Sequence, residues 1–373
     1  AFYEKVAAWY PSSAEAEQAL WEGALTYYRL GRADVTAQLL GRLRQAFPSS
    51  RLQQRAALWE AKSLLAGGDR EQARQILTMV AGDPQPDYDV LRARQILATM
   101  GQLTPTPTPV AVADERDVFV HWLEGWAGSA THWDVSGDLH VQRGLLLHEL
   151  RLYRQAAAEL ALARASVRDD AWALAAFAEY MQEAGLYYQM IAAANRLLAL
   201  STAPLEEAPR YLLRLLYPQP YQHLVEAAAG EYSVDALWLF ALMRQESLFD
   251  RYAVSSAMAR GLTQVIPTTA AEIAQRLGVA NFRQEDLFKP LVSIRFGAWY
   301  LAQQNKATGG NLPMALAAYN GGLTNARRWA SNQQGDFDID LFVEDITFSE
   351  TQAYVRLVFQ YHAMYASLSS PLR

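Results

Sequence analysis

The sequence predicts an all-α protein of two parts, a repetitive helical array followed by a compact helical domain. Three observations support this prediction. Apolar residues recur with a helical period along much of the 373-residue chain. No alternating segment is long enough for a strand of useful length. Short segments of the first half recur at a spacing near 38 residues. We place the first part at residues 1–216 and the second at residues 217–373.

The composition limits the class of protein. With 51% hydrophobic and 19% charged residues the chain can bury a large core, and its length suggests two or three domains. The net charge of -6 gives no basic surface for a nucleic acid. Cysteine is absent, so disulfides and thiolate metal sites are excluded. No run approaches the ~18 apolar residues of a membrane span. The start at Ala1 has no initiator Met or signal peptide, which we interpret as a processed or trimmed start.

Two pairs of segments define the repeat in the first part. Ala19-Leu-Trp-Glu22 returns as Ala57-Leu-Trp-Glu60, and Tyr10-Pro-Ser-Ser13 returns as Phe47-Pro-Ser-Ser50. Each unit is expected to be a helical hairpin, close to the ~34-residue repeat of tetratricopeptide-like arrays. Because a single hairpin cannot bury its own apolar face, we expect the units to stack into a curved α-solenoid. The alternative is an irregular helical bundle without a true repeat.

Glycines mark the expected turns of these hairpins, at Gly31 and at Gly67-Gly68. More degenerate units follow at residues 145–164 and 171–200, the latter with a turn at Ala184-Gly185. Between the two groups, at about residues 101–115, alternating prolines predict an exposed, extended loop, with partner docking as an alternative. Three tryptophans follow this loop and are expected to pack between repeats: Trp122, Trp126 and Trp133.

The second part contains an almost wholly apolar run, residues 234–247, which is typical of a buried helix. Ser233 is the expected N-cap and Asp235 lies in the expected first turn. Glu246 then lies in the last turn, in apolar surroundings and at the negative end of the helix dipole. Both effects raise the pKa of a carboxyl group. A carboxylic acid that stays protonated near neutral pH can protonate a glycosidic oxygen.

Four further helices are expected after this run. Pro267 precedes a capping box, Thr269-Ala-Ala-Glu272, for a helix that stops at Gly278. Pro290 opens a helix over residues 291–306, and Pro313 opens a short helix that ends at Gly321-Gly322. A second capping box, Ser349-Glu-Thr-Gln352, starts a final helix to about Tyr365.

Several motifs stand in a characteristic order along residues 217–366. They are Tyr217-Pro-Gln-Pro-Tyr221, Arg244-Gln-Glu-Ser247, Ser255, Gly261-Leu-Thr-Gln-Val-Ile-Pro267, Ala317-Ala-Tyr-Asn-Gly-Gly322 and Phe342-Val-Glu-Asp-Ile-Thr-Phe-Ser-Glu-Thr351. This order and spacing resemble the soluble lytic transglycosylases, which cleave bacterial peptidoglycan. The resemblance implies a lysozyme-like catalytic domain preceded by a helical superhelix.

The resemblance implies that Glu246 is the single catalytic carboxylate. It would protonate the leaving oxygen and then, as a base, take the proton of the C6 hydroxyl of N-acetylmuramic acid. That hydroxyl attacks C1 and closes a 1,6-anhydro ring. The alternative is a structural carboxylate paired with Arg244 or Arg260. Asp250 is the nearest candidate for a second carboxylate, and its loop-forming surroundings favour a solvated turn residue instead.

The resemblance assigns substrate binding to seven residues: Ser255, Gly261, Gln264, Ile266, Tyr319, Asn320 and Glu350. Side-chain hydroxyls and amides would bond the sugars, Gly261 would admit a close backbone approach, and Ile266 would line the cleft. We expect the Tyr319 hydroxyl to bond Glu246 or the acetamido group. Structural alternatives are a loop serine, a core tyrosine, a helix-capping Asn320 and a Glu350 that complements a helix dipole.

The chain departs from the family pattern at two positions near the cleft. Thr263 stands where the family has Met, and this smaller polar residue is expected to loosen the packing beneath the cleft. Met258 stands where the family often has Gly, which suggests that the loop takes another path and fills a subsite. These departures bear on substrate preference more than on reaction type.

The expected ligands are peptidoglycan glycan strands, without cofactor or metal. The six histidines show no paired metal spacing, and no glycine-rich phosphate loop occurs. The resemblance implies the periplasm or cell envelope, and the solenoid offers a surface for cell-wall protein partners. Two rival interpretations remain open. One is a goose-type-lysozyme-like muramidase, which is a hydrolase, and the other is a non-catalytic peptidoglycan-binding scaffold.

Overall fold

A computed structural model describes residues 2–9, 13–83, 87–101, 114–333 and 336–369, and the prediction of an all-α chain is confirmed. Within these ranges no strand occurs, and isolated bridges join Arg260 to Val254 and Val265. The expected proline-rich loop falls largely outside the described residues. In the same ranges no helix has the length and apolar character needed to cross a membrane.

The chain forms two compact units. Unit 1 comprises residues 1–107 and 328–345, and unit 2 comprises residues 108–327 and 346–373. The proposed domain boundary at 216/217 lies inside unit 2 and stays a prediction. The segment 328–345, which we placed in the second domain, is grouped with the N-terminal helices because its side chains are bound by them.

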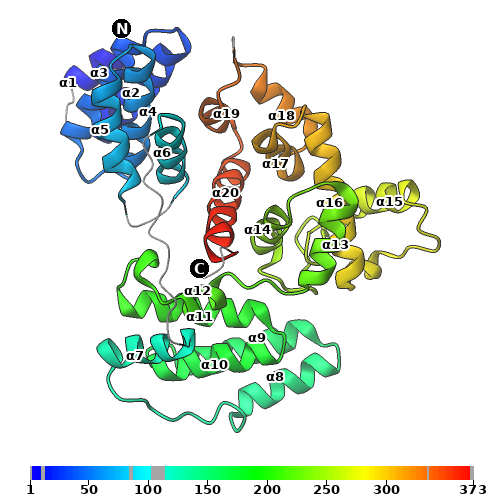
Figure 1. The fold of residues 1–373 in the computed structure, drawn as a ribbon. Helices are drawn as coiled ribbons and strands as arrows, with labels where there is room; N and C mark the ends of the chain where they lie inside the picture. Colours follow the sequence, from blue (N-terminus) through cyan, green and yellow to red (C-terminus); the bar gives the residue numbers. More distant parts are fainter. Residues whose placement is uncertain (1, 10–12, 84–86, 102–113, 334–335, 370–373) are drawn as a thin grey trace. The chain divides into compact units, whose positions relative to one another are not determined.

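Unit 1 is a stack of helices in which each packs on the next along the chain (Figure 1). The bounds are α1 Phe2–Trp9, α2 Ala14–Arg29, α3 Ala33–Ala46, α4 Gln53–Ala66, α5 Arg70–Ala81, α6 Tyr88–Thr99 and α19 Ile339–Asp345. Gly31 and Gly68 have positive φ at the predicted turns. The repeated tryptophans, Trp21 and Trp59, lie on α2 and α4 and are both buried. The repeat in the sequence therefore corresponds to equivalent core positions of successive hairpins.

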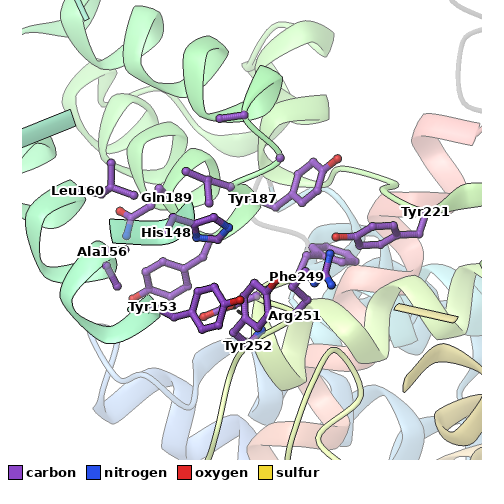
Figure 2. Close-up of a pocket in the computed structure, with 16 residues that line it drawn as sticks. His148, Tyr153, Ala156, Leu160, Tyr187, Gln189, Tyr221, Phe249, Arg251 and Tyr252 are labelled. Carbon is purple, nitrogen blue, oxygen red and sulfur yellow. Dashed lines mark hydrogen bonds between the residues drawn. The ribbon is translucent and has the colours of Figure 1, made fainter. Parts of the chain in front are cut away.

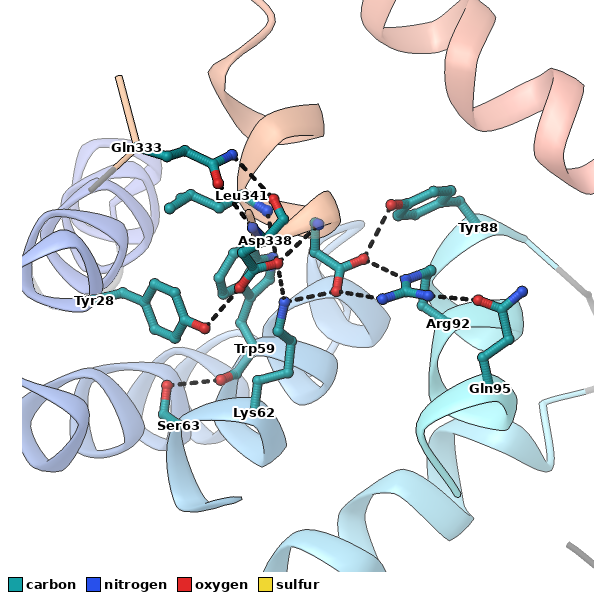
Figure 3. A network of polar contacts seen from close by, with 11 residues as sticks. Tyr28, Trp59, Lys62, Ser63, Tyr88, Arg92, Gln95, Gln333, Asp338 and Leu341 are labelled. Carbon is teal, nitrogen blue, oxygen red and sulfur yellow. Dashed lines mark hydrogen bonds and ion pairs between the residues drawn. The ribbon is translucent and has the colours of Figure 1, made fainter. Parts of the chain in front are cut away.

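Ion pairs hold α19 within unit 1 (Figure 3). Asp340 is 1% exposed, and its carboxylate accepts hydrogen bonds from Lys62 Nζ at 2.6 Å, Arg92 Nε at 2.6 Å and the Tyr88 hydroxyl at 3.0 Å. Lys62 Nζ also lies 2.6 Å from an oxygen of Asp338. We call Lys62, Tyr88, Arg92, Asp338 and Asp340 the α19 ion cluster. Because cations surround it, the pKa of Asp340 is held well below its usual range despite burial.

The first helices of unit 2 continue the hairpin pattern. Their bounds are α7 Glu115–Ala127, α8 Leu139–Glu149, α9 Tyr153–Ser166, α10 Ala171–Glu183, α11 Tyr187–Ser201 and α12 Arg210–Leu216. Gly185, with φ +69°, makes the predicted turn between α10 and α11. Trp133 stacks on Phe177 of α10 as expected, whereas Trp126 is 37% exposed and meets Trp122 edge-on.

The remaining helices of unit 2 form the part of the unit that contains α14. They are α13 Gln222–Tyr232, α14 Ala236–Ser247, α15 Pro267–Arg276, α16 Pro290–Ala307, α17 Leu312–Gly321, α18 Leu323–Ala330 and α20 Ser349–Ser369. Helix α18 contains the boundary between the two units. Helices α13, α16 and α20 pack against α14, and α17 packs against α16 and α20. The predicted helices are confirmed, and the final helix is longer than expected.

Two predicted helix starts are wrong. The N-cap of α14 is Asp235, whose carboxylate accepts the Leu237 N–H at 2.8 Å, while Ser233 ends α13 in the left-handed conformation. Helix α15 starts at Pro267 without a side-chain cap, so Thr269 lies inside its first turn. Helix α14 is capped by the residue directly before it, Asp235, and not by the earlier Ser233. Helix α15 begins with a proline, which has no backbone N–H, so no side chain is needed to bond one there.

Candidate active site

Glu246 lies in the last turn of α14, which is buried over residues 239–244. Glu246 keeps part of its surface exposed, although its carboxyl group lies in largely buried surroundings. Burial raises its pKa to about 8, the nearby charge of Glu350 adds to this increase, and a hydrogen bond from Tyr354 opposes it. The predicted elevation of the pKa is therefore present, and desolvation is its main cause. Such a group carries a proton at neutral pH and can act as a general acid.

Tyr354 is a polar partner of Glu246 that we did not predict from the sequence. Its hydroxyl donates a 2.8 Å hydrogen bond to Glu246 Oε1 from the buried side of α20. A signal for this residue was present, because Tyr354 follows Glu350 by four positions and so shares its helix face. The shared face explains why both residues of α20 act on the same carboxyl group.

Tyr319 lies beside this pair but binds elsewhere. Its hydroxyl donates to the carbonyl oxygen of Thr263 at 2.8 Å, and its ring packs edge-on against Tyr300. The expected hydrogen bond to Glu246 is replaced by this loop contact. Burial and the charge of Glu246 raise the pKa of Tyr319 well above its usual value, so the two side chains are electrostatically coupled. Its expected bond to an acetamido group stays a prediction.

The loop between α14 and α15 is held by side chains that we predicted for the substrate. Gln264 donates from Nε2 to the carbonyl oxygens of Ala253 at 3.1 Å and Gly261 at 2.9 Å. Ser255 Oγ accepts the Ala259 N–H at 3.1 Å. These contacts shape the loop, and the substrate roles of Gln264 and Ser255 stay predictions.

The close packing around position 261 leaves no space for a side chain and therefore requires glycine. Its φ is +77°, and a Cβ atom there would lie 2.1 Å from the carbonyl oxygen of Leu287 and 2.9 Å from Ser293 Oγ. Any side chain would therefore displace the neighbouring backbone. The close approach that we expected toward the substrate occurs here toward the protein, and a substrate contact of Gly261 stays a prediction.

The two departures from the family pattern behave differently. Thr263 was expected to loosen the packing, and this is wrong. The side chain is 1% exposed, its Oγ1 donates to the Ser293 carbonyl at 2.8 Å, and a Cβ on Gly297 would lie 2.4 Å from it. Met258 is 49% exposed at φ +61°, in the turn that follows Ser255. A subsite role for Met258 stays a prediction.

The remaining predicted site residues lie at helix ends in unit 2. Asn320 Oδ1 accepts the Thr351 hydroxyl at 2.6 Å, so it joins α17 to α20. Glu350 is exposed in the first turn of α20. Ile266 is 42% exposed, as a residue that lines a cleft would be. The structure thus connects Glu246, Tyr319, Tyr354 and Glu350 electrostatically, while the sugar contacts of all these residues stay predictions.

The structural alternative for Glu246 required a pairing with Arg244 or Arg260. Arg244 instead donates from Nε to the Leu216 carbonyl at 3.0 Å, with its guanidinium over the rings of two tyrosines. Arg260 pairs with Glu285 at 2.8 Å. Both arginines are therefore engaged elsewhere, and the raised pKa of Glu246 is consistent with a carboxyl group that lacks a cationic partner.

Asp250 lies in the expected turn, where its Oδ1 accepts the Tyr252 N–H at 2.9 Å. The expectation of a solvated residue is wrong, because the side chain is partly buried and burial raises its pKa. Over the described part of the chain, no group of three or more His, Cys, Asp and Glu side chains could hold a metal ion.

The fold and site describe an all-α protein with a carboxylic acid that lacks a cationic partner among the described residues, at the end of a buried helix, and the chain is similar in sequence and fold to known proteins. Residues 223–342 match the family model of the transglycosylase SLT domain. The chain is 36% identical over 158 residues to a putative soluble lytic murein transglycosylase of Haemophilus influenzae, covering 42% of this chain and 27% of the relative. It is 33% identical over 150 residues to the soluble lytic murein transglycosylase of Salmonella typhimurium, covering 40% and 23%.

Two solved structures share the fold over nearly the whole chain. The lytic transglycosylase Slt of Pseudomonas aeruginosa aligns with a TM-score of 0.74 at 24% identity, covering 99% of this chain and 55% of that one. The 70 kDa soluble lytic transglycosylase of Escherichia coli aligns with a TM-score of 0.73 at 21% identity, covering 96% and 52%. The chain thus spans about half the length of these structures. The predicted resemblance to soluble lytic transglycosylases and the predicted fold class are confirmed.

Proposed function

We propose that this protein is a lytic transglycosylase that cleaves the β-1,4 bond between N-acetylmuramic acid and N-acetylglucosamine in peptidoglycan. The observation that carries the proposal is Glu246, a partly exposed residue whose buried carboxyl group has a pKa of about 8. A general acid works best when its pKa lies near the working pH. The named relatives, which are lytic murein transglycosylases, support the same class of substrate.

The proposed reaction uses Glu246 twice. The protonated carboxyl group donates its proton to the glycosidic oxygen, and the bond between that oxygen and C1 of the muramic acid breaks. The resulting carboxylate then removes the proton of the C6 hydroxyl, whose oxygen forms a new bond to C1. The proton returns to Glu246, and no water is consumed. This differs from the paired-carboxylate scheme, in which one residue delivers water or acts as a nucleophile.

Tyr354 supports the second half of this cycle. A hydroxyl that donates to a carboxyl oxygen stabilises the ionised form, which is the base. Burial favours the protonated form, which is the acid. The two influences oppose each other, so Glu246 can exchange its proton near neutral pH. The seven predicted substrate residues, including Gln264, Tyr319 and Glu350, would bind the sugar rings beside it.

Product chemistry tests the proposal. Purified peptidoglycan is digested in heavy-oxygen water and the muropeptides are analysed by mass spectrometry. We expect 1,6-anhydro-N-acetylmuramic acid ends without the heavy isotope. Label at the reducing ends of most products would assign the protein to the muramidases instead. Binding of glycan strands without any turnover would identify a non-catalytic scaffold.

We also propose where the protein acts and what the helical array does. Its substrate lies in the periplasm or cell envelope, so we expect the protein there. The helical array would guide glycan strands or bind cell-wall protein partners, because stacked hairpins present extended surfaces. Fractionation of cells that express the full-length protein tests the location, and detection in the cytoplasm alone would contradict it.

A further inference from the structure

A cavity lies in unit 2 (Figure 2), and Glu246 is not among the residues that line it. It is a cavity of about 220 Å³ between the helical hairpins α8–α11 and the loop that follows α14. One side is lined by residues 184–189 together with His148, Tyr153, Ala156, Ala157 and Leu160, and the other by Tyr221 with residues 249–252. None of the predicted site residues takes part in it.

Aromatic rings form much of the wall of this cavity. Tyr153 and Tyr252 stack with their centroids 3.5 Å apart, and His148 meets both rings edge-on. Tyr187 lies edge-on to Tyr221 at 6.1 Å. Such surfaces offer dispersion contacts to the flat, C–H-bearing face of a ligand.

Polar groups complete the cavity. Asp250 and Arg251 are neighbours of opposite charge, so the lining has little net charge from this pair. The buried Gln189 uses its Oε1 to accept from Arg164, and its NH₂ group remains a donor. The hydroxyls of Tyr187 and Tyr221 have no hydrogen-bond partner among the described residues, and burial raises the pKa of both. These hydroxyls can each donate to and accept from a ligand.

We propose that this cavity binds one N-acetylated sugar ring of a glycan strand. A pyranose has an apolar C–H face for the tyrosine rings and several hydroxyls for the carboxylate, the amide and the phenols. The volume is below the ~300 Å³ of an ordinary small-molecule site, which favours one ring over an oligomer. The balance of Asp250 and Arg251 disfavours a strongly ionic ligand. The choice of an N-acetylated sugar rests on the proposed function.

The position of the cavity gives the site a role. The loop that carries Asp250 and Tyr252 begins directly at the end of α14, two residues after Glu246. Leu248 and Phe249 hold positive φ values of +47° and +61° there, which are unfavourable for such side chains. A sugar ring bound in the cavity contacts this loop and retains a strand on the enzyme while Glu246 acts elsewhere on the polymer.

Hydrogen–deuterium exchange on the full chain tests the proposal, with N-acetylglucosamine as the probe. Ala157 lines the cavity and is exposed on α9, so Ala157→Trp fills the cavity without removing a buried group. Its neighbour Ala158 is also exposed and does not line the cavity, so Ala158→Trp is the matched control. Thermal unfolding shows whether both variants fold.

We expect the sugar to slow exchange at residues 184–190 and 249–252 in the unmodified chain and in Ala158→Trp. In Ala157→Trp the apparent affinity at these segments should fall at least about tenfold, which is 1.4 kcal/mol. Absence of protection in the unmodified chain, or equal protection in both variants, would overturn the proposal. Protection at residues 264–266 and glycan turnover report the catalytic cleft separately, so a failure of the proposed function is distinguishable from a failure of this site.

Discussion

Two carboxyl groups of this chain lie in largely buried surroundings, and their pKa values are shifted in opposite directions. Glu246 has a pKa of about 8, whereas the pKa of Asp340 is held well below its usual range. Desolvation raises both pKa values. Asp340 accepts from Lys62 and Arg92, whose charges outweigh desolvation, while Glu246 has a tyrosine hydroxyl and a nearby carboxylate.

The comparison teaches that burial alone does not decide what a carboxyl group does. A buried carboxylate that pairs with two cations has a structural role. Removing its charge leaves the two cations buried without a partner, which destabilises the fold. A buried carboxyl group without a cation keeps its proton and becomes a reagent. The same chain uses the first arrangement in unit 1 and the second in unit 2.

The largest expected effect is in the α19 ion cluster. Asp340→Asn removes the charge that Lys62 and Arg92 share, so we expect a loss of about 3–5 kcal/mol in the free energy of unfolding. Urea denaturation of the full chain measures it. Glu71→Gln is the control, because its ion pair with Arg74 is exposed, and it should leave the stability unchanged. An equal loss of stability in both variants would show that the buried ion cluster contributes no more than an exposed ion pair.

Glu246→Gln should abolish most activity and leave the fold intact. The amide keeps the shape but cannot donate a proton, so turnover of peptidoglycan should fall at least ~100-fold. Its thermal unfolding temperature should not decrease, because a neutral amide is easier to bury than a charge. Glu272→Gln, which changes an exposed carboxylate on α15, is the matched control and should retain most activity. Near-normal turnover in Glu246→Gln would end the assignment of the catalytic acid.

The pH dependence of the two groups should have opposite signs. The pKa of Glu246 is higher in the folded state than its ordinary value of 4.5, so its contribution to stability is full below pH 4.5 and declines as the pH rises toward about 8. The contribution of Asp340 is present above its ordinary value of 3.8 and is lost as the pH falls. Denaturation at several pH values, with Glu246→Gln and Asp340→Asn as references, measures the contribution of each carboxyl group to the free energy of unfolding. The rate should fall above about pH 8, as the acid loses its proton.

The smallest expected effect belongs to Tyr354. Its hydrogen bond lowers the pKa of Glu246, so Tyr354→Phe should shift the alkaline limb of the rate profile to higher pH. We expect turnover to fall about tenfold, since hydrogen bonds to charged groups contribute about 1.5–3 kcal/mol. Tyr365→Phe is the control, because that hydroxyl donates to the Pro218 carbonyl. An unchanged limb in Tyr354→Phe would show that the hydroxyl does not tune Glu246.

The sequence predicted the helices and the environment of Glu246 because both follow from local pattern. An apolar run over residues 234–247 specifies a buried helix wherever it packs, and prolines and glycines mark helix ends at Pro290 and Gly278. The repeated tryptophans likewise located the core of the hairpins.

Long-range partners could not be predicted in the same way. Which hydroxyl reaches Glu246 depends on how α20 crosses α14, so Tyr354 was missed and Tyr319 was given its contact. The partners of Asp340 lie some 250–280 residues earlier in the chain, and nothing local marks them. From the sequence alone, Thr263 is expected to be too small to fill its position. Its side chain packs against Gly297, which is distant in the sequence and has no side chain, so threonine fills the space between them.

The grouping of α19 with the N-terminal helices has a consequence for how this protein can be divided. Unit 1 consists of two stretches of chain separated by 220 residues, with unit 2 continuing after the second stretch. A single cut at the predicted boundary would leave Asp340 on one fragment and Lys62 and Arg92 on the other. The two parts are therefore not interchangeable modules, and a recombinant exchange of one part must carry both stretches or replace the ion cluster with apolar residues.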